Sequence, residues 1–334
     1  MRFFHGTPEQ LARLVSAMNA IPVSQSFPAP PGWRPAEYET TLERPFTVKG
    51  PATYRKGNTS VLEFRPTEQP GWWINRTDFP EQLPIQVHVR NVWTSLRNIV
   101  LRSGCPHNYL RMSEHIICQR LGLGLDNVVI HTETGDPPLF EEGSMPIVEG
   151  ILQARLRELP DRPLAYWTVS EPVSLIGPDG NSFLTFLPDE RRTRKLSLDV
   201  AIDFPTVIGK QRLQFDLTQD AFVYGAHART NCSLTQMRLL KYLGWIFADT
   251  RHFGYNRKNI LVAGKHRYST TPKMLHEGRS LEAVWHRACL DLVAALSLIG
   301  SGRLCGQILS YRAGHTLDCR LMTFLHLQDL LVRV

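Results

Sequence analysis

The chain has 334 residues, of which 43% are hydrophobic and 21% are charged. This composition is typical of a globular protein, and the length is sufficient for two domains, each with its own core. The formal charge of +7 suits an anionic partner such as nucleic acid, phospholipid or a nucleotide-bearing substrate, but it selects none of them.

The sequence also excludes some classes of protein. No apolar stretch approaches the roughly 18 residues of a membrane-spanning helix, and the first residues lack the apolar region of a signal peptide. The 6 cysteines form no C-x-x-C pair, which favours reduced thiols over a disulfide framework or a thiolate zinc site. We therefore expect a cytoplasmic protein without a stable membrane span.

Residues 1–37 form the first segment. Thr7, Pro8 and Gln10 supply an N-cap, a first-turn proline and a capping box, which predict a helix from Pro8 to about Met18. Prolines between positions 22 and 35 then exclude a continued helix or a central strand. We expect a loosely packed N-terminal extension and Pro-rich linker.

Residues 38–157 are predicted to form the first domain. Alternating apolar and polar residues predict strands over 60–65 and 83–90, and a further strand is expected over 127–132. Helices are expected from Ser113 to Gly122, which supply an N-cap and a C-terminal glycine, and over 146–156. The proline-bounded segment 159–163 is typical of an interdomain linker.

Residues 158–334 are predicted to form the second domain. Strands are expected over 164–173, 182–187, 196–204, 212–217, 259–262 and 304–311. Helices are expected over 221–243, with a break at 229–231, over 282–299, and after the last strand. Strands followed by helices, twice over, indicate an α+β protein of two similarly built domains, each a sheet layered with helices.

Three stretches carry candidate functional residues: 113–115, the helix predicted over 282–299, and 314–316. The helix over 282–299 is otherwise apolar, so its polar side chains cost free energy unless something satisfies them. On spacing alone, a Ser-capped helix start with a favourable first-turn Glu explains the stretch after residue 112 without any chemistry. The candidates for a functional site are Glu114, His115, His286, Arg287, Asp291 and His315.

Several short motifs follow one another between about Thr40 and Phe324: Val61–Pro66, Arg76–Asp78, Ser113–His115, Leu121–Asn127, Glu142–Ser144 with Pro146, Asp220–Phe222, Ala228–Thr230, Leu290–Asp291 and Ser310–Leu321. In composition and order they resemble one family, the UDP-3-O-acyl-N-acetylglucosamine deacetylases, zinc hydrolases of lipid A synthesis. The resemblance implies two domains with an active-site cleft between them.

The resemblance also implies a mechanism. Zinc would be held by two His and one Asp, with an open position for a water molecule whose pKa the metal lowers. Matched position by position, His115 and Asp291 would be zinc ligands, and Glu114 the base that takes the proton of the water. Thr230 and a cationic His315 would stabilise the oxyanion.

The second His ligand departs from the family pattern Arg-His-Lys-x-Leu-Asp, in which His and Asp are four residues apart on one helix face. An ungapped alignment puts Arg287, which cannot ligate a metal, at that position. His286 precedes Asp291 by five residues, about 140° round a regular helix. It reaches the same ion only through a one-residue π-bulge.

Other positions depart from the family pattern as well. Ala295 stands where the family has an Asp that supports the catalytic His, and Asn231 stands where it has Phe. Ahead of Glu114, the family's Ser-Thr-Val is replaced by Arg-Met-Ser.

Two functional hypotheses follow. In the first, the chain is a zinc-dependent deacetylase of a UDP-linked acylated amino sugar, with His286 drawn into the metal site or with a weaker two-residue site. In the second, it has lost zinc and binds a UDP-sugar or lipid precursor as a regulatory protein. Arg287 would then pair with a carboxylate such as Asp291 or with a substrate phosphate.

The sequence predicts some of the partners of the chain. The UDP-linked substrate is one, and Asn231 is a further candidate for binding it. Nucleic-acid binding is not expected, because no basic stripe is interleaved with aromatic residues. We expect a monomer that makes at most transient contact with a membrane surface.

Overall fold

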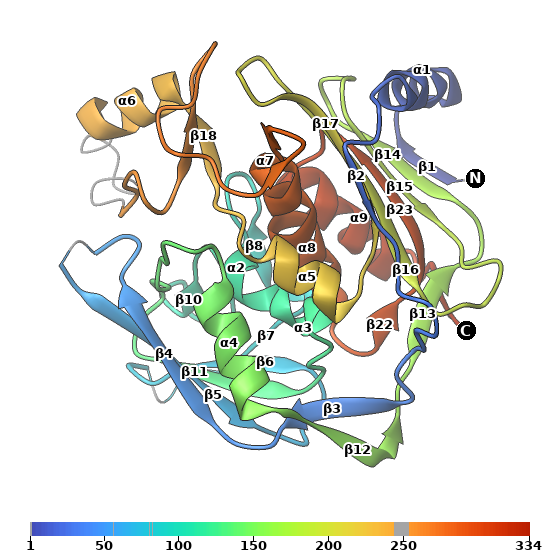
Figure 1. The fold of residues 1–334 in the computed structure, drawn as a ribbon. Helices are drawn as coiled ribbons and strands as arrows, with labels where there is room; N and C mark the ends of the chain where they lie inside the picture. Colours follow the sequence, from blue (N-terminus) through green and yellow to red (C-terminus); the bar gives the residue numbers. More distant parts are fainter. Residues whose placement is uncertain (1, 56, 80, 82, 244–253) are drawn as a thin grey trace.

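Two large β-sheets face each other across a layer of helices (Figure 1). The computed structural model describes residues 2–55, 57–79, 81, 83–243 and 254–334. The helices are α1 (Pro8–Asn19), α2 (Glu114–Ile117), α3 (Gln119–Gly122), α4 (Met145–Ala154), α5 (Gln219–Gly225), α6 (Leu234–Leu243), α7 (Glu282–Trp285), the π-helical η3 (His286–Leu292), α8 (Val293–Leu296) and α9 (His315–Leu327), with 3-10 turns η1 (Val89–Asn91) and η4 (Ser297–Ile299).

The first large sheet has five strands, in the order β4 (Phe46–Pro51), β5 (Thr59–Pro66), β11 (Val128–Thr132), β6 (Trp72–Arg76) and β7 (Ile85–Gln86). The second has seven strands, in the order β1 (Arg2–His5), β14 (Val173–Ile176), β15 (Phe183–Leu187), β23 (Gly306–Tyr311), β16 (Leu196–Phe204), β17 (Gly209–Asp216) and β2 (Gln25–Phe27). These sheets and helices confirm the α+β class.

Smaller sheets complete the chain. Their strands are β3 (Tyr38–Leu42) with β12 (Leu156–Pro163); β8 (Val92–Thr94), β9 (Val100–Arg102) and β10 (Tyr109–Leu110); β13 (Tyr166–Val169), β22 (Arg303–Leu304) and β24 (Leu331–Arg333); β18 (Asn231–Ser233) with β19 (Leu261–Ala263); and β20 (Leu275–His276) with β21 (Arg279–Ser280). Among the described residues, no helix is both long and apolar enough to cross a membrane.

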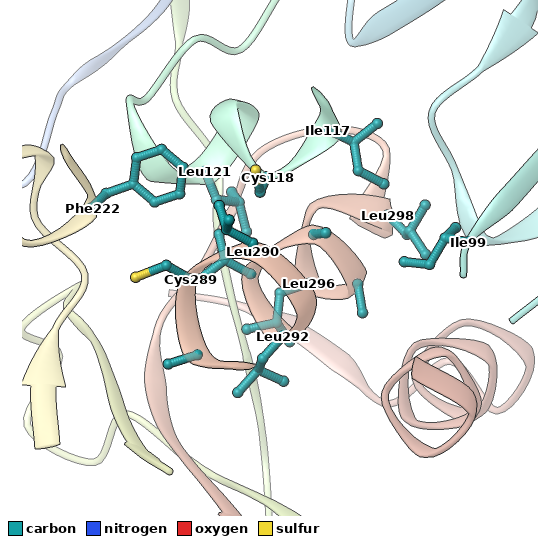
Figure 2. Packing of buried hydrophobic residues seen from close by; sticks show 14 of the residues in the cluster. Ile99, Ile117, Cys118, Leu121, Phe222, Cys289, Leu290, Leu292, Leu296 and Leu298 are labelled. Atoms are coloured by element: carbon teal, nitrogen blue, oxygen red, sulfur yellow. The ribbon is translucent and has the colours of Figure 1, made fainter. Parts of the chain in front are cut away.

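One continuous cluster of buried side chains joins the two large sheets, so the expectation of two separate cores is wrong. Figure 2 shows side chains of α2, α3, α5, η3 and α8 meeting in its centre. A Cβ on Gly122 would collide with the ring of Phe222, and one on Gly225 would collide with the sulfur of Cys289. These glycines therefore allow α3, α5 and η3 to approach closely.

The N-terminal segment is not a loose extension, and that expectation is corrected. The helix predicted from Pro8 is present as α1, with the expected capping box at Thr7. However, β1 pairs in parallel with β14 and β2 pairs in parallel with β17, so the segment supplies both edges of the seven-stranded sheet. The apolar face of α1 packs on the outer side of this sheet (Figure 1).

Two further local predictions are wrong. The strand expected over 83–90 is reduced to the two residues of β7, followed by a 3-10 turn. The linker expected over 159–163 is the end of β12, which pairs with β3. The five-stranded sheet uses residues 46–132 alone, but the division into domains at 38–157 and 158–334 stays a prediction.

Candidate active site

The helix predicted over 282–299 changes its winding at His286, the candidate for the second histidine ligand. It begins as α7, becomes π-helical over His286–Leu292 and continues as α8. The π turn absorbs the extra residue, and His286 Nδ1 lies 3.4 Å from Asp291 Oδ1. The structure therefore contains the bulge that His286 needs in order to face Asp291.

Arg287 does not occupy the ligand position that an ungapped alignment gives it. Its Nη2 lies 2.6 Å from Oδ1 of Asp318, and its Nε donates to the carbonyl of Ala313 at 2.8 Å. Arg287 and Asp318 are both buried, so this is an ion pair with little access to water. A carboxylate partner was expected for Arg287, but it is Asp318 and not Asp291. Contact with a substrate phosphate stays a prediction.

His115 reaches the same place from the first half of the chain. Thr230 Oγ1 lies 2.9 Å from Nε2 of His286 and 3.3 Å from Nε2 of His115. The two imidazole rings are 5.3 Å apart between centroids. Burial, followed by the proximity of His286, lowers the pKa of His115 to about 3, so its ring is neutral at pH 7. A neutral imidazole can act as a metal ligand.

His315 begins α9 and faces the carboxylate from another side. Its Nε2 lies 3.5 Å from Asp291 Oδ1. Burial opposes a charge on this ring, but the nearby carboxylates of Asp291 and Glu114 outweigh burial and raise the pKa of His315. Burial likewise opposes a charge on Asp291, yet His286 and His315 hold the pKa of Asp291 below its ordinary value.

Glu114 lies at the start of α2, but not as a solvated first-turn residue. Its carboxylate is buried and accepts a hydrogen bond from the backbone N–H of Ile99 at 3.0 Å. Burial raises the pKa of Glu114, although His315 acts in the opposite sense. The predicted cap is wrong, because the Ser113 hydroxyl donates to the Ile99 carbonyl and makes no bond to the helix.

The sequence did not predict two buried ion pairs near the site. One is the pair of Arg287 with Asp318, described above, and the other joins Arg229 to Glu282. Arg229 Nε lies 2.6 Å from Oε1 of Glu282, and both side chains are buried. This pair ties the residue before Thr230 to the start of α7, and hence brings Thr230 to His286. The motif Ala228–Thr230 pointed to this segment, and the motif Ser310–Leu321 contains Asp318. Neither signal identified a partner.

Asn231 follows Thr230 in the chain and is half-buried in β18. Its neighbour in the two-stranded sheet is Leu261 of β19. These facts place Asn231 beside the candidate site, and its role in substrate binding stays a prediction.

The fit to a zinc ion, which the family resemblance implies, can be judged from these side chains. Asp291 Oδ1 is buried without a hydrogen-bond partner among the described residues, and it faces nitrogens of His286 and His315 at 3.4 and 3.5 Å. Two ligands of a tetrahedral zinc lie about 3.3 Å apart. The 3.4 Å between His286 and Asp291 therefore suits two ligands of one zinc ion. The family resemblance, and not this spacing, makes His115 the third ligand, and it gives His315 a different role. The described residues nonetheless contain no cluster of three His, Cys, Asp or Glu side chains already converged on one point.

Comparison with known proteins shows the family of the chain. A family profile described as UDP-3-O-acyl N-acetylglycosamine deacetylase (LpxC) matches residues 39–326. The chain belongs to this family. A UDP-3-O-acyl-N-acetylglucosamine deacetylase of Geobacter sp. is 26% identical over 288 residues, which cover 86% of this chain and 88% of the relative.

Two further relatives widen the comparison. A protein of the same name from Solibacter usitatus is 24% identical, over 85% of this chain and 90% of the relative. A bifunctional enzyme LpxC/FabZ of Porphyromonas gingivalis is 26% identical, over 84% of this chain and 62% of the relative. The similarity thus spans most of the chain at modest identity.

Proposed function

We propose that this chain removes the N-acetyl group from a UDP-3-O-acyl-N-acetylglucosamine-like substrate in lipid A biosynthesis, by zinc-dependent hydrolysis. The observation that carries the proposal is the π turn, which brings His286 to Asp291 and to Thr230, beside His115. The names of the relatives supply the substrate class. We expect the enzyme to act as a cytoplasmic monomer that makes at most transient contact with a membrane surface.

His115, His286 and Asp291 would hold the zinc ion. When bound there, zinc lowers the pKa of a water molecule and acts as a Lewis acid toward the acetyl carbonyl. The depressed pKa of Asp291 keeps its carboxylate ionised at neutral pH, and the depressed pKa of His115 keeps its imidazole neutral. Both residues are thereby in the protonation state that a metal ligand requires.

Glu114 is the general base in this proposal. The N–H of Ile99 orients the carboxylate, which takes the proton of the attacking water. The raised pKa of Glu114 moves it toward the operating pH, where a general base accepts a proton most effectively. The same buried acid can then release that proton later in the reaction.

Thr230 and His315 act on the other atoms of the amide. The Thr230 hydroxyl donates a hydrogen bond to the oxyanion that develops from the acetyl carbonyl. His315, whose raised pKa favours the cationic form, stabilises the same charge and delivers a proton to the departing amine nitrogen.

One observation favours the alternative, a binding protein that has lost its metal. The Thr230 oxygen lies between the Nε2 atoms of His115 and His286, and no three ligands converge among the described residues. The alternative chain would bind a UDP-sugar through the same residues without hydrolysing it.

Metal analysis of the purified full chain, combined with mass spectrometry of a UDP-3-O-acyl-N-acetylglucosamine incubation, separates the two functions. We expect about one zinc per chain and loss of the acetyl group, both abolished by Asp291→Ala. A metal-free protein that binds the UDP-sugar and leaves it intact would contradict the proposal and support the alternative.

A further inference from the structure

The N-terminal strand β2 contacts the helical segment that carries His286. Trp285 Nε1 donates a hydrogen bond to Oε1 of Gln25 at 2.8 Å. Trp285 is the last residue of α7, is fully buried, and directly precedes His286. The family match begins only at residue 39, so Gln25 lies in a part of the chain to which the family match assigns no role.

The surroundings of Trp285 make this hydrogen bond decisive for the orientation of the indole ring. Three aromatic rings surround it: Tyr224 at 5.0 Å, Phe215 at 5.3 Å and Phe27 at 6.1 Å between centroids. These rings fill the space round the indole, and its N–H donates to Gln25. A buried indole N–H without an acceptor is unfavourable, so the position of the Gln25 amide selects the orientation of the ring.

Gln25 is itself held firmly by the seven-stranded sheet. It pairs with Leu213 in the parallel register of β2 and β17. On either side, the N–H of Ser24 donates to the Arg212 carbonyl at 2.7 Å, and the N–H of Ala29 donates to the Asp216 carboxylate at 2.9 Å. These contacts fix the backbone at Gln25, from which its side-chain amide reaches Trp285.

The orientation of Trp285 is linked to that of His286 through the backbone. Trp285 and His286 are consecutive residues of one continuous helical segment, so a rotation of that segment about its axis moves both side chains together. A π turn is rare and persists only where its surroundings hold it. On the far side of His286, Arg287 is anchored to Asp318 and Ala313.

We propose that Gln25 is a positioning residue for His286: by holding the Trp285 indole, the N-terminal strand keeps the π segment in the winding that presents His286 to Asp291. The active site is then completed by a segment outside the family match. The part of this inference that concerns catalysis rests on the proposed function, whereas the part that concerns the winding of residues 282–299 does not.

Backbone amide hydrogen exchange tests the positioning directly in the full chain. Gln25→Leu removes the acceptor, and Ser26→Ala is the matched control on the exposed side of the same strand. We expect exchange of the peptide covering residues 286–292 to accelerate about tenfold in Gln25→Leu and to stay unchanged in Ser26→Ala. Equal protection of residues 286–292 in both variants would overturn the inference.

A double-mutant cycle with Trp285→Phe gives the second readout, because phenylalanine has no N–H to donate. We expect Gln25→Leu to lower kcat and zinc affinity by about tenfold with KM within about twofold, and to add almost nothing when Trp285→Phe is already present. Additive effects of the two substitutions would mean that Gln25 acts independently of Trp285 and would refute the positioning role.

These readouts separate this inference from the proposed function. If the wild-type chain neither binds zinc nor hydrolyses the substrate while Gln25→Leu still loosens residues 286–292, the proposed function fails and the positioning of the π segment stands. If the wild type is active and Gln25→Leu changes neither exchange, zinc affinity nor kcat, the positioning role fails alone.

Discussion

The two histidines that meet at Thr230 lie on helical segments of opposite kinds. His115 lies in the single turn of α2, where the Ser-Glu-His motif has the spacing of the family. His286 opens a π-helical segment, where the spacing to Asp291 is one residue too long for a regular helix. In α2 the local motif is sufficient to place the side chain. In η3 the placement depends on contacts made by the neighbours Trp285 and Arg287. A π turn inside a buried helix can thus bring together two side chains that are five residues apart.

The largest effect should come from a substitution in α2, the segment whose local motif places its side chains. Glu114→Gln keeps an acceptor for the N–H of Ile99 but cannot take a proton, so kcat should fall by roughly 10²–10⁴. Steady-state kinetics and thermal unfolding of the same preparation measure the two consequences. Loss of activity with an unchanged melting temperature is expected, and activity within a factor of two of the wild type would remove Glu114 from the mechanism.

The next largest effect should come from the buried ion pair of Arg287 and Asp318, which holds the π-helical segment η3. Asp318→Ala leaves the guanidinium of Arg287 buried without its carboxylate, which should lower the free energy of unfolding by about 3–5 kcal/mol. Chemical denaturation provides the measurement. As a control, Glu171→Ala breaks the exposed pair with Arg2 and should change the free energy of unfolding far less, because water screens that pair. Equal effects of the two substitutions would show that the buried pair does not anchor η3.

The pH dependence of kcat should report the two groups that transfer protons, Glu114 of α2 and His315 of α9. Glu114 must be ionised to act, and burial raises its pKa, so kcat should fall as pH drops through a value above the ordinary carboxyl range. His315 must be protonated; burial opposes this, but Asp291 and Glu114 raise its pKa, so kcat should also fall as pH rises above the ordinary imidazole range. Each limb should approach about tenfold per pH unit. A His315→Gln variant that keeps the alkaline limb would contradict the assignment.

The smallest effect should come from removing the irregularity itself. Deletion of Ala288 returns His286 and Asp291 to a separation of four residues, so the segment should wind as a regular α-helix and retain zinc and activity within about tenfold. Deletion of Ala294 in α8 is the control, because no bulge can absorb it and the buried face would be misaligned. A folded Ala288 deletion without zinc would show that the π geometry itself is required.

The contrast between α2 and η3 also describes what the sequence can predict. Residue type and motif order are sufficient to name four candidate residues from the sequence: Glu114, His115, Asp291 and His315. The need for a π-bulge at His286 followed from helix geometry, but its presence did not, because it depends on tertiary contacts of Trp285 and Arg287. The pairing of Arg287 with Asp318 joins residues that no local pattern connects.

Long-range pairing explains the errors in the fold. Strands β1 and β2 join partners more than 150 residues away, at Val173 and Leu213, and strands of four and three residues are too short to show an alternation of their own. The segment 159–163 contains two prolines, which suggested a linker, yet it lies in a two-stranded sheet where few ladder hydrogen bonds are needed. Local sequence patterns carry no information about either pairing.

The most direct test of the central claim is zinc binding by the wild-type chain and by His286→Gln, measured by competition with a chromogenic chelator. We predict about one zinc per wild-type chain and an affinity reduced more than about 100-fold in His286→Gln, because loss of a ligand should exceed the effect of losing an outer-shell partner. Equal zinc affinity in the two proteins, or no zinc in the wild type, would contradict the account of His286 as the second histidine ligand.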